Sequence, residues 1–375
     1  MPTTRLMGSI QSGARPGYRP RGRRRWGRSQ GRTACLRGSI GLVPDGPMEL
    51  GRWEPRCDRP DGLVTPRGLD RSGCGEGITP GVARGPWFRR TSPGRYVPIQ
   101  VDESVVEQRI LEQGSRLRGT GAVTGWASLR WQGAAYFTGL DVEGNRRPVP
   151  LLVGPALVRG DERVVVTQEQ IFPAEILSCG DIRCTRADRA TFDEIRDVSQ
   201  WSVREAVVAG DMAIAARLIS ADQLRSYVAA RRSWTGVPRA REVVALVRDG
   251  SRSPQETRMR LIWMLDAQLP NPLINREVYD RAGHLIGIPD LLDPVAGVVG
   301  EYDGGDHRRR DRRRKDIARL ERFADHGLVS FVIVEGDLRD RDAVRRRMLA
   351  ARERASFLPE ERRRWTLEPP GPNAA

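Results

Sequence analysis

Hydrophobic and polar positions change their period several times along the chain, and these changes divide it into regions. After a turn at Pro93-Gly94, apolar residues at 96–99 predict a short strand. Apolar positions near helical spacing then predict two helices, over 102–117 and over 124–134 with Thr124 as the N-cap. Alternating apolar residues predict strands over 147–154, 162–167, 174–178 and 181–185. We expect residues 85–186 to form a mixed α+β domain.

From residue 187 to about residue 250 the pattern is helical. Ser220 stands before Asp222 and Gln223, which is a typical helix start, and Gly210 and Gly236 punctuate the run. We expect residues 187–250 to form a small helical connector.

The last region, 251–356, alternates between helix and strand. Pro254 is favoured at a first helical position, and Ser253 and Glu256 have the spacing of a capping box. Three strands are predicted over 273–279, 284–292 and 295–303, followed by a helix over about 309–325, a strand over 328–334 and a helix over about 339–355. The fold class is therefore α/β, with the C-terminal order αβββαβα.

Composition sets the two ends of the chain apart. Residues 1–80 are rich in Gly, Arg, Pro and Ser without apolar periodicity, so we expect a disordered tail there, and another over 357–375. Residues 1–100 hold 19 arginines and 7 acidic residues, which is +12 of the formal charge of +15. The first tail is either an arm that binds nucleic acid or upstream sequence from a start codon placed too early, with Met48 or a later codon as the true start. Composition favours the second interpretation.

Charge and cysteine usage narrow the class of protein. The excess of basic residues favours a polyanionic partner, although Lys315 is the only lysine and the arginine bias is typical of a GC-rich genome. No apolar run approaches the ~20 residues that cross a bilayer. The five cysteines form no CxxC pair, so neither a zinc site nor a disulfide framework is indicated. We expect a cytoplasmic protein without membrane association or a small-molecule cofactor.

Acidic residues gather where the predicted strands 284–292 and 295–303 end. Side chains alternate faces along a strand, so Glu301 and Asp303 point the same way. Asp290 lies near the end of the preceding strand of a presumed hairpin. If the register pairs the two strand ends, three carboxylates meet at one edge and could hold Mg²⁺ or Mn²⁺. Each carboxylate alone could equally be an exposed strand-end residue, and we assign Asp293 to an ordinary Asp-Pro turn.

A histidine and a run of arginines follow the acidic residues. His307 could orient a water molecule or protonate a leaving oxygen, and Arg308, Arg309 and Arg312 could hold a nucleic-acid backbone. The alternative for the arginine run is a solvated helix face. Trp126, Trp131 and Trp201 are expected in the core.

In this order the motifs resemble those of a known family. Residues 251–350 are similar to the very-short-patch-repair-like endonuclease group of the PD-(D/E)XK nuclease superfamily. The matching residues are Ser253-Pro254-x-Glu256, Leu269-Pro270, Pro289-Asp290, Glu301-Tyr302-Asp303-Gly304 and His307. Residues 85–250 resemble the N-terminal region of related actinobacterial proteins, some of which carry a segment similar to AbiEi-type antitoxins.

The resemblance implies a restriction-endonuclease-like fold and a set of site residues. Asp290, Glu301 and Asp303 would hold the divalent metal, Glu256 would approach from the first helix, and His307 would lie near the scissile phosphate. The usual superfamily motif ends in lysine, where this chain has Asp303. The position of Glu256 fits a catalytic role and a helix-capping role equally well, and both interpretations stay open.

Two functions follow from these residues. The first is a Mg²⁺-dependent endonuclease that hydrolyses DNA phosphodiester bonds. The second is a catalytically inactive DNA-binding or antitoxin-like regulator that keeps the nuclease fold. A third and more neutral interpretation is a structural partner module without a nucleic-acid role.

Overall fold

The computed structural model describes most of the chain from Gly62 onwards. The described residues are 62–71, 77–117, 121–141, 143–154, 158–197, 199, 201–304 and 310–369, with only the backbone described for 310–316. They all belong to one compact unit, Pro55–Ala375. The predicted tail at 1–80 therefore lies largely outside the described residues, as do His307, Arg308 and Arg309.

The first described elements form a small three-stranded sheet. Its strand order is β1-β3-β2, and both pairings are antiparallel. The predicted turn at Pro93-Gly94 joins β2 to β3, and Gly94 has the positive φ of 73° that favours glycine. Leu63 is buried in the main core, so ordered structure begins before residue 80. The bounds are β1 Arg67–Gly68, α1 Pro80–Ala83, β2 Phe88–Ser92 and β3 Arg95–Pro98.

A five-stranded sheet with order β6-β5-β4-β8-β7 follows. The predicted strands are all present, including the hairpin of β7 and β8 across Gly180. Thr124 is the N-cap residue of α3, although its hydroxyl bonds Asp193 and Thr185 and caps no helical N–H. The bounds are α2 Val106–Gly114, β4 Ala122–Val123, α3 Gly125–Trp131, β5 Val149–Leu152, β6 Val164–Thr167, β7 Ile176–Cys179, β8 Ile182–Thr185 and α4 Ala187–Ile195.

The helices after residue 187 share their core with this sheet. One cluster of buried apolar side chains runs from Leu63 to Leu261 and includes Trp126, while Trp131 and Trp201 pack against it. The predicted domain boundary at residue 187 therefore does not separate two hydrophobic cores. The capping box of Ser220 and Gln223 is present. The bounds are α5 Val203–Ala215, α6 Ala221–Ala229, α7 Val237–Leu246 and α8 Pro254–Leu261, with a π-helical turn at Ile262–Asp266.

The C-terminal strands form two sheets, where the sequence predicted one hairpin of long strands. The predicted strand 273–279 is broken at Asn275, whose φ of 48° is left-handed. The predicted strand 284–292 is broken at Pro289, which has no N–H for a ladder. The bounds are β9 Leu273–Ile274, β10 Val278–Asp280, β11 Leu285–Gly287, β12 Leu291–Asp293, β13 Val298–Asp303, α9 Arg310–Asp325, β14 Val329–Val334, α10 Arg341–Glu353 and β15 Trp365–Thr366.

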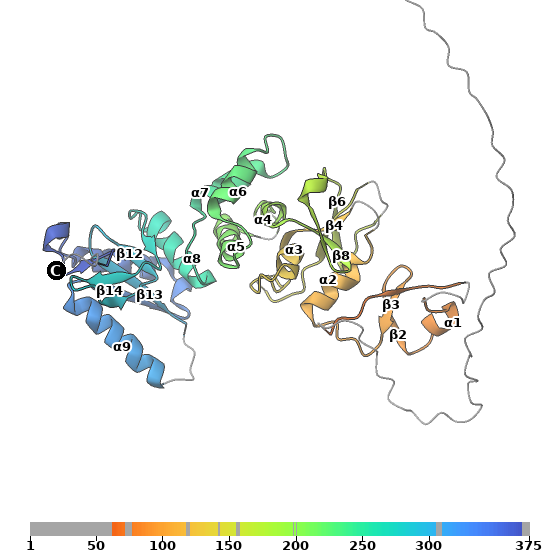
Figure 1. The fold of residues 1–375 in the computed structure, drawn as a ribbon, viewed down its shortest axis with the longest axis horizontal. Coiled ribbons are helices and arrows are strands. Elements are labelled where there is room, and N and C mark those ends of the chain that lie inside the picture. Colours follow the sequence, from red (N-terminus) through yellow and green to blue (C-terminus); the bar gives the residue numbers. More distant parts are fainter. Residues whose placement is uncertain are drawn as a thin grey trace, which may run out of the picture. The chain divides into compact units, whose positions relative to one another are not determined.

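The larger of these sheets has the order β14-β13-β12-β9 and helices on both sides (Figure 1). β13 and β14 are parallel and joined by α9, which packs against β14 and β11. One face packs against α8, the π-helical turn and α10 through a core that contains Trp263 and Phe331. The other face carries Val299 and Phe323 in a separate core.

The C-terminal segment completes the second sheet, whose order is β11-β10-β15. Trp365 of β15 is buried and packs into the core of Val299 and Phe323. The expected disordered tail at 357–375 is therefore structured over at least 357–366. Its short strand pairs with β10 across more than 80 positions of sequence, which local patterning does not reveal.

Three ion pairs join α5 to α8 and the π-helical turn. Arg258 makes a two-point contact with Glu205, and Arg204 makes one with Asp266. The third pair is fully buried: Asp211 Oδ2 accepts from Arg260 Nη2 at 2.7 Å and from Thr257 Oγ1 at 2.9 Å. Burial raises the pKa of Asp211, and the adjacent Arg260 opposes that rise. Among the described residues, no helix has the length and apolar character of a membrane span.

Replacing Asp211 with alanine is expected to lower the free energy of unfolding by about 3–5 kcal/mol, because it leaves Arg260 charged and buried. Asp222→Ala is the matched control, since Asp222 forms an exposed pair with Arg225, and it should change stability by less than ~1 kcal/mol. Urea denaturation followed by circular dichroism measures both. Equal losses in the two variants would contradict the central role of the buried pair.

Candidate active site

Asp290 and Glu301 occupy facing positions at the open end of the β12–β13 ladder. Leu291 pairs with Gly300 and Leu292 with Val299 in antiparallel register. The next position in that register places Asp290 opposite Glu301, and facing residues of an antiparallel pair project from the same side of the sheet. Asp290 Oδ2 accepts from the backbone N–H of Tyr302 at 2.7 Å. This bond satisfies a backbone donor of β13 that lies past the last residue pair of the β12–β13 ladder. The fold therefore brings these two predicted carboxylates together.

Glu301 points to the face of the sheet covered by α9. Its side chain is buried, and Oε2 accepts from Arg319 Nη2 of α9 at 2.7 Å. Arg319 is a residue that the sequence did not indicate, because it lies 18 positions after Glu301 among many other arginines. Its guanidinium places a positive charge at the carboxylate pair.

Glu256 approaches the same place from the first turn of α8. The N-cap Ser253 accepts from the Glu256 N–H, but the Glu256 carboxylate does not return the bond to Ser253. Oε2 instead accepts from the Arg252 N–H at 2.8 Å and from Asn275 Nδ2 at 2.7 Å. Glu256 thus joins the start of α8 to the turn after β9, and its capping contact is one residue earlier than predicted.

Burial and neighbouring charges act on the Asp290 carboxyl group. Burial raises the pKa of Asp290 to about 6, and the negative charge of Glu256 acts in the same direction, while the Tyr302 N–H and the charge of Arg319 oppose the rise. An additional cation near Asp290 would therefore be favourable, because it would stabilise the ionised form of a carboxyl group that is partly removed from water.

Among the remaining predicted residues, the structure describes the side chain of Asp303 alone. Asp303 is exposed, beyond the end of β12. Arg312 lies on the described backbone of α9, and His307, Arg308 and Arg309 lie outside the described residues. In the portion of the chain that the structure describes, no three His, Cys, Asp or Glu side chains are grouped so as to hold a metal ion. The predicted group of Asp290, Glu301 and Asp303 is therefore not formed.

A smaller ligand set remains compatible with a hard cation. Mg²⁺ keeps several water molecules and commonly takes only one or two protein carboxylates together with substrate phosphates. Asp290 and Glu301 would supply two oxygen ligands on one face, and a nearby cation would favour the ionised form of Asp290, whose pKa is raised mainly by burial. These two residues fit a divalent ion, and Asp303 is not needed for the fit.

Asp293, to which we gave no role in the chemistry, has a structural one. Oδ1 accepts from the N–H groups of Val295 and Ala296, which forms the predicted turn. Oδ2 is 3.0 Å from Arg352 Nε, so the same buried carboxylate fixes α10 to the β12–β13 turn.

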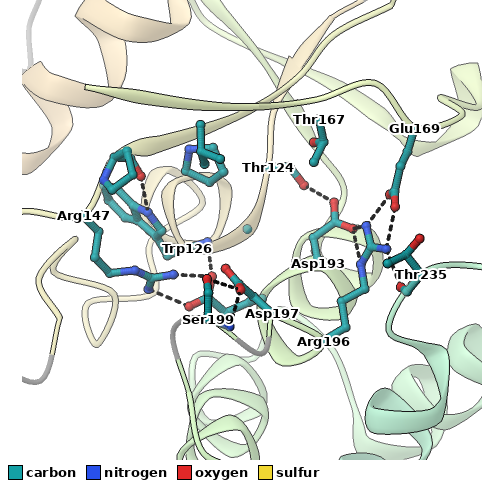
Figure 2. Close-up of a pocket in the computed structure, with 15 residues that line it drawn as sticks. Thr124, Trp126, Arg147, Thr167, Glu169, Asp193, Arg196, Asp197, Ser199 and Thr235 are labelled. Atoms are coloured by element: carbon teal, nitrogen blue, oxygen red, sulfur yellow. Dashed lines mark hydrogen bonds and ion pairs between the residues drawn. The ribbon is translucent and has the colours of Figure 1, made fainter. Parts of the chain in front are cut away.

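The described part of the chain before α8 contains a cavity of about 380 Å³ that the sequence did not indicate. Its walls come from the β4–α3 turn, β5, β6 and α4, as Figure 2 shows. Glu194 accepts from the Trp126 N–H at 2.9 Å and pairs with Arg147 at 2.7 Å. The Arg147 guanidinium also lies over the ring of Trp201.

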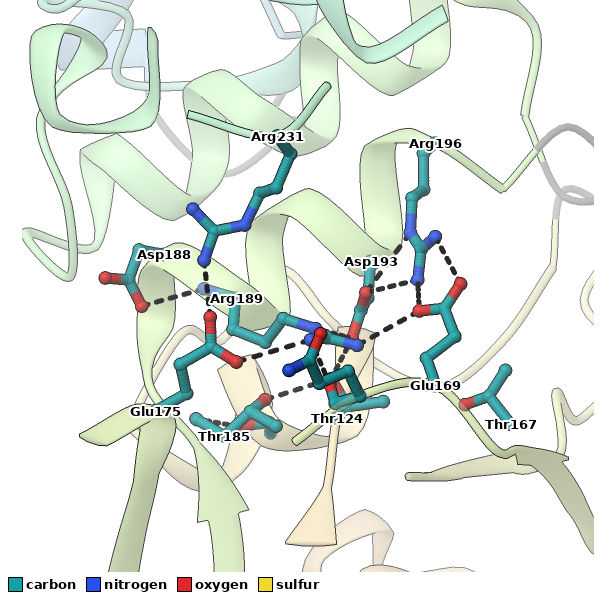
Figure 3. Close-up of polar contacts among 12 residues, drawn as sticks. Thr124, Thr167, Glu169, Glu175, Thr185, Asp188, Arg189, Asp193, Arg196 and Arg231 are labelled. Carbon is teal, nitrogen blue, oxygen red and sulfur yellow. Dashed lines mark hydrogen bonds and ion pairs between the residues drawn. The ribbon is translucent and has the colours of Figure 1, made fainter. Parts of the chain in front are cut away.

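A network of buried charges borders this cavity (Figure 3). The Arg189 side chain is completely buried and contacts Glu169, Glu175 and Asp193. Arg196 bridges Glu169 and Asp193 from the other side. These carboxylates are neutralised by protein arginines and join α4 to the strands, so we interpret the cavity border as a structural junction.

No protein-family model, no curated protein and no solved structure matches this chain.

Removing the Glu256 carboxylate is expected to destabilise the fold, because it leaves the Asn275 amide and the Arg252 N–H without their acceptor. Glu256→Ala should lower the free energy of unfolding by about 1–3 kcal/mol. Glu242→Ala, an exposed position in α7, is the control and should remain within ~0.5 kcal/mol of the parent. Chemical denaturation distinguishes the two, and a Glu256→Ala protein as stable as the parent would show that these contacts contribute nothing.

Proposed function

We propose that residues 251–356 form a divalent-metal-dependent nuclease domain that hydrolyses DNA phosphodiester bonds. The observation that carries the proposal is the register of the β12–β13 ladder, which places Asp290 opposite Glu301 when it is continued by one position, together with the hydrogen bond from Tyr302 N–H to Asp290. A restriction-endonuclease-like topology is part of the same proposal. It is supported by α8 on one face of the sheet and by the parallel β13–β14 pair joined through α9.

Each residue of the candidate active site would have its own role in the proposed hydrolysis. Asp290 and Glu301 would hold the ion, which when bound supplies a Lewis acid beside the phosphate and lowers the pKa of a bound water. The hydrogen bond from Tyr302 N–H fixes the direction of the Asp290 carboxylate. The contacts of Glu256 with Arg252 and Asn275 hold α8 against the turn after β9. The arginine-rich sequence that begins at residue 308 would hold the phosphate backbone.

A specific observation favours the second candidate, a DNA-binding or antitoxin-like regulator without cleavage. Arg319 already neutralises Glu301, and Asp303 replaces the superfamily lysine that would orient the attacking water. In that case the carboxylates would serve the fold alone, and the arginines would contact nucleic acid without catalysis.

Charge-removing variants of nearly identical shape test the nuclease. Asp290→Asn retains an acceptor for the Tyr302 N–H, and Glu301→Gln retains one for Arg319. Each is expected to reduce Mg²⁺-dependent nicking of supercoiled DNA about a thousandfold, because the loss of metal binding removes several kcal/mol of transition-state stabilisation. Glu353→Gln, at an exposed position of α10, should nick as the parent does. If Asp290→Asn and Glu301→Gln also nick as the parent does, the site assignment is wrong.

Binding in the presence of a chelator separates the two candidates. The parent should bind duplex DNA with an affinity that falls steeply with salt, since phosphate contacts release counterions. Salt-sensitive binding together with Mg²⁺-dependent nicking supports the nuclease. The same binding without nicking at any Mg²⁺ or Mn²⁺ concentration supports the regulator. Failure to retain DNA at low salt rejects both.

A further inference from the structure

A second cavity, of about 520 Å³, lies far along the chain from the carboxylate pair. It is open to solvent and lies where the β2–β3 hairpin meets the end of α2 and the segment leading into β6. Its lining residues share one property: all but one are charged or capable of hydrogen bonding. They are Arg90, Thr91, Ser92, Pro93, Arg116, Asp161, Glu162 and Arg163.

Arg116 is the most buried cation of this cavity. Its side chain is only 7% exposed, and Nη1 donates to Asp161 Oδ2 at 2.7 Å. The Nε of the same guanidinium is buried without a hydrogen-bond partner. A buried guanidinium that uses so few of its five N–H donors is unusual, because unsatisfied buried donors cost free energy.

Arg163 joins the two walls of the cavity. The β2–β3 pairing has a bulge between Arg90 and Ser92, and such bulges redirect the backbone of one strand. The carbonyls of Arg90 and Thr91 at this bulge accept from Arg163 Nη1 at 3.4 and 3.3 Å. Since the Arg163 side chain is nearly half exposed, its remaining donors are available to a ligand.

The acidic residues of the cavity leave a net positive charge. Asp161 is occupied, because Oδ2 accepts from Arg116 while Oδ1 accepts from the N–H groups of Arg163 and Val164. Glu162 is highly exposed and lies 3.7 Å from Arg163 Nε. Three guanidinium groups therefore face one opening with one carboxylate already bonded and one largely in water.

We propose that this cavity, the Arg90/Arg116/Arg163 site, binds a phosphate group of a nucleic-acid backbone. Arginine is suited to phosphate because its planar fork presents paired N–H donors to two oxygens. A phosphodiester requires an open site through which the chain can continue on both sides, and this cavity is open. The choice of nucleic acid as the polyanion rests on the proposed function, whereas the anion chemistry rests on the three arginines alone.

The test removes two exposed arginines of the site and leaves the buried one in place to protect the fold. Arg90→Ala combined with Arg163→Ala is compared with Arg232→Ala combined with Arg241→Ala, two exposed arginines outside the site. Both pairs lower the net charge equally. Fluorescence anisotropy with a short labelled duplex in a chelating buffer measures affinity across ~50 to ~200 mM salt.

The site variant is expected to bind the duplex about tenfold more weakly than the parent, and its slope of log affinity against log salt should become shallower by about 0.9 for each phosphate that the two arginines neutralise. The control pair should keep the slope of the parent. Equal behaviour of the two double variants would overturn the proposal. Arg116→Gln, measured after its folding is verified by circular dichroism, should weaken binding in the same way.

Two further arms identify the source of the anion. If inorganic phosphate alone raises the melting temperature of the parent and not of the site variant, while duplex affinity is the same in both, the site takes free phosphate and the nucleic-acid assignment is overturned. Binding of polyglutamate in place of DNA overturns it as well. Nicking is the readout for Asp290→Asn and binding in a chelating buffer is the readout for the arginine variant, so the two losses test separate sites.

Discussion

The buried ion pair between Asp211 and Arg260 is the interaction on which the arrangement of the described chain depends. α8 lies between two cores, because Leu261 belongs to the large N-terminal cluster while Met259 and Trp263 belong to the cluster beneath β13. A short helix shared in this way needs a fixed rotation about its axis. Asp211 supplies it by accepting from Thr257 and Arg260 on successive turns, in surroundings where no water competes for the bonds. That rotation also brings Glu256 towards Asp290.

The carboxylates of the candidate active site show how structural and chemical roles can coincide. Asp290 satisfies a backbone donor, Glu256 holds the start of α8, and Glu301 pairs with Arg319. Each contact stabilises the fold, while burial and the negative charge of Glu256 raise the pKa of Asp290. A site that binds a cation needs such an imbalance, and a purely structural ion pair removes it. Whether Glu301 binds a metal ion or only pairs with Arg319 therefore decides whether the two carboxylates have a catalytic role or a structural one.

The arginines, which dominate the charge of the chain, are used in two different ways. Arg147, Arg189, Arg196 and Arg260 are buried and paired with carboxylates, so they hold secondary-structure elements together. Arg90, Arg116 and Arg163 line an opening, and the buried Nε of Arg116 has no hydrogen-bond partner there. Net charge does not distinguish the two groups, because the number of partners around each guanidinium depends on residues distant in sequence.

Local patterning was sufficient to predict the helix at α2, the strands from β5 to β8, the Pro93-Gly94 turn and the capping box of Ser220 and Gln223. These depend on periodicity and on contacts within a few residues, which a single sequence contains. The same patterning identified Asp290 and Glu301, because acids at the ends of apolar strands are conspicuous. The folded chain was needed to show that the strands change sheets at Pro289, that Trp365 completes a core, and that Glu256 and Arg319, and not Asp303, surround the carboxylate pair. Strand pairing and ion pairing join residues that are distant in sequence. The sequence alone therefore does not show which of the 62 arginines pairs with Glu301.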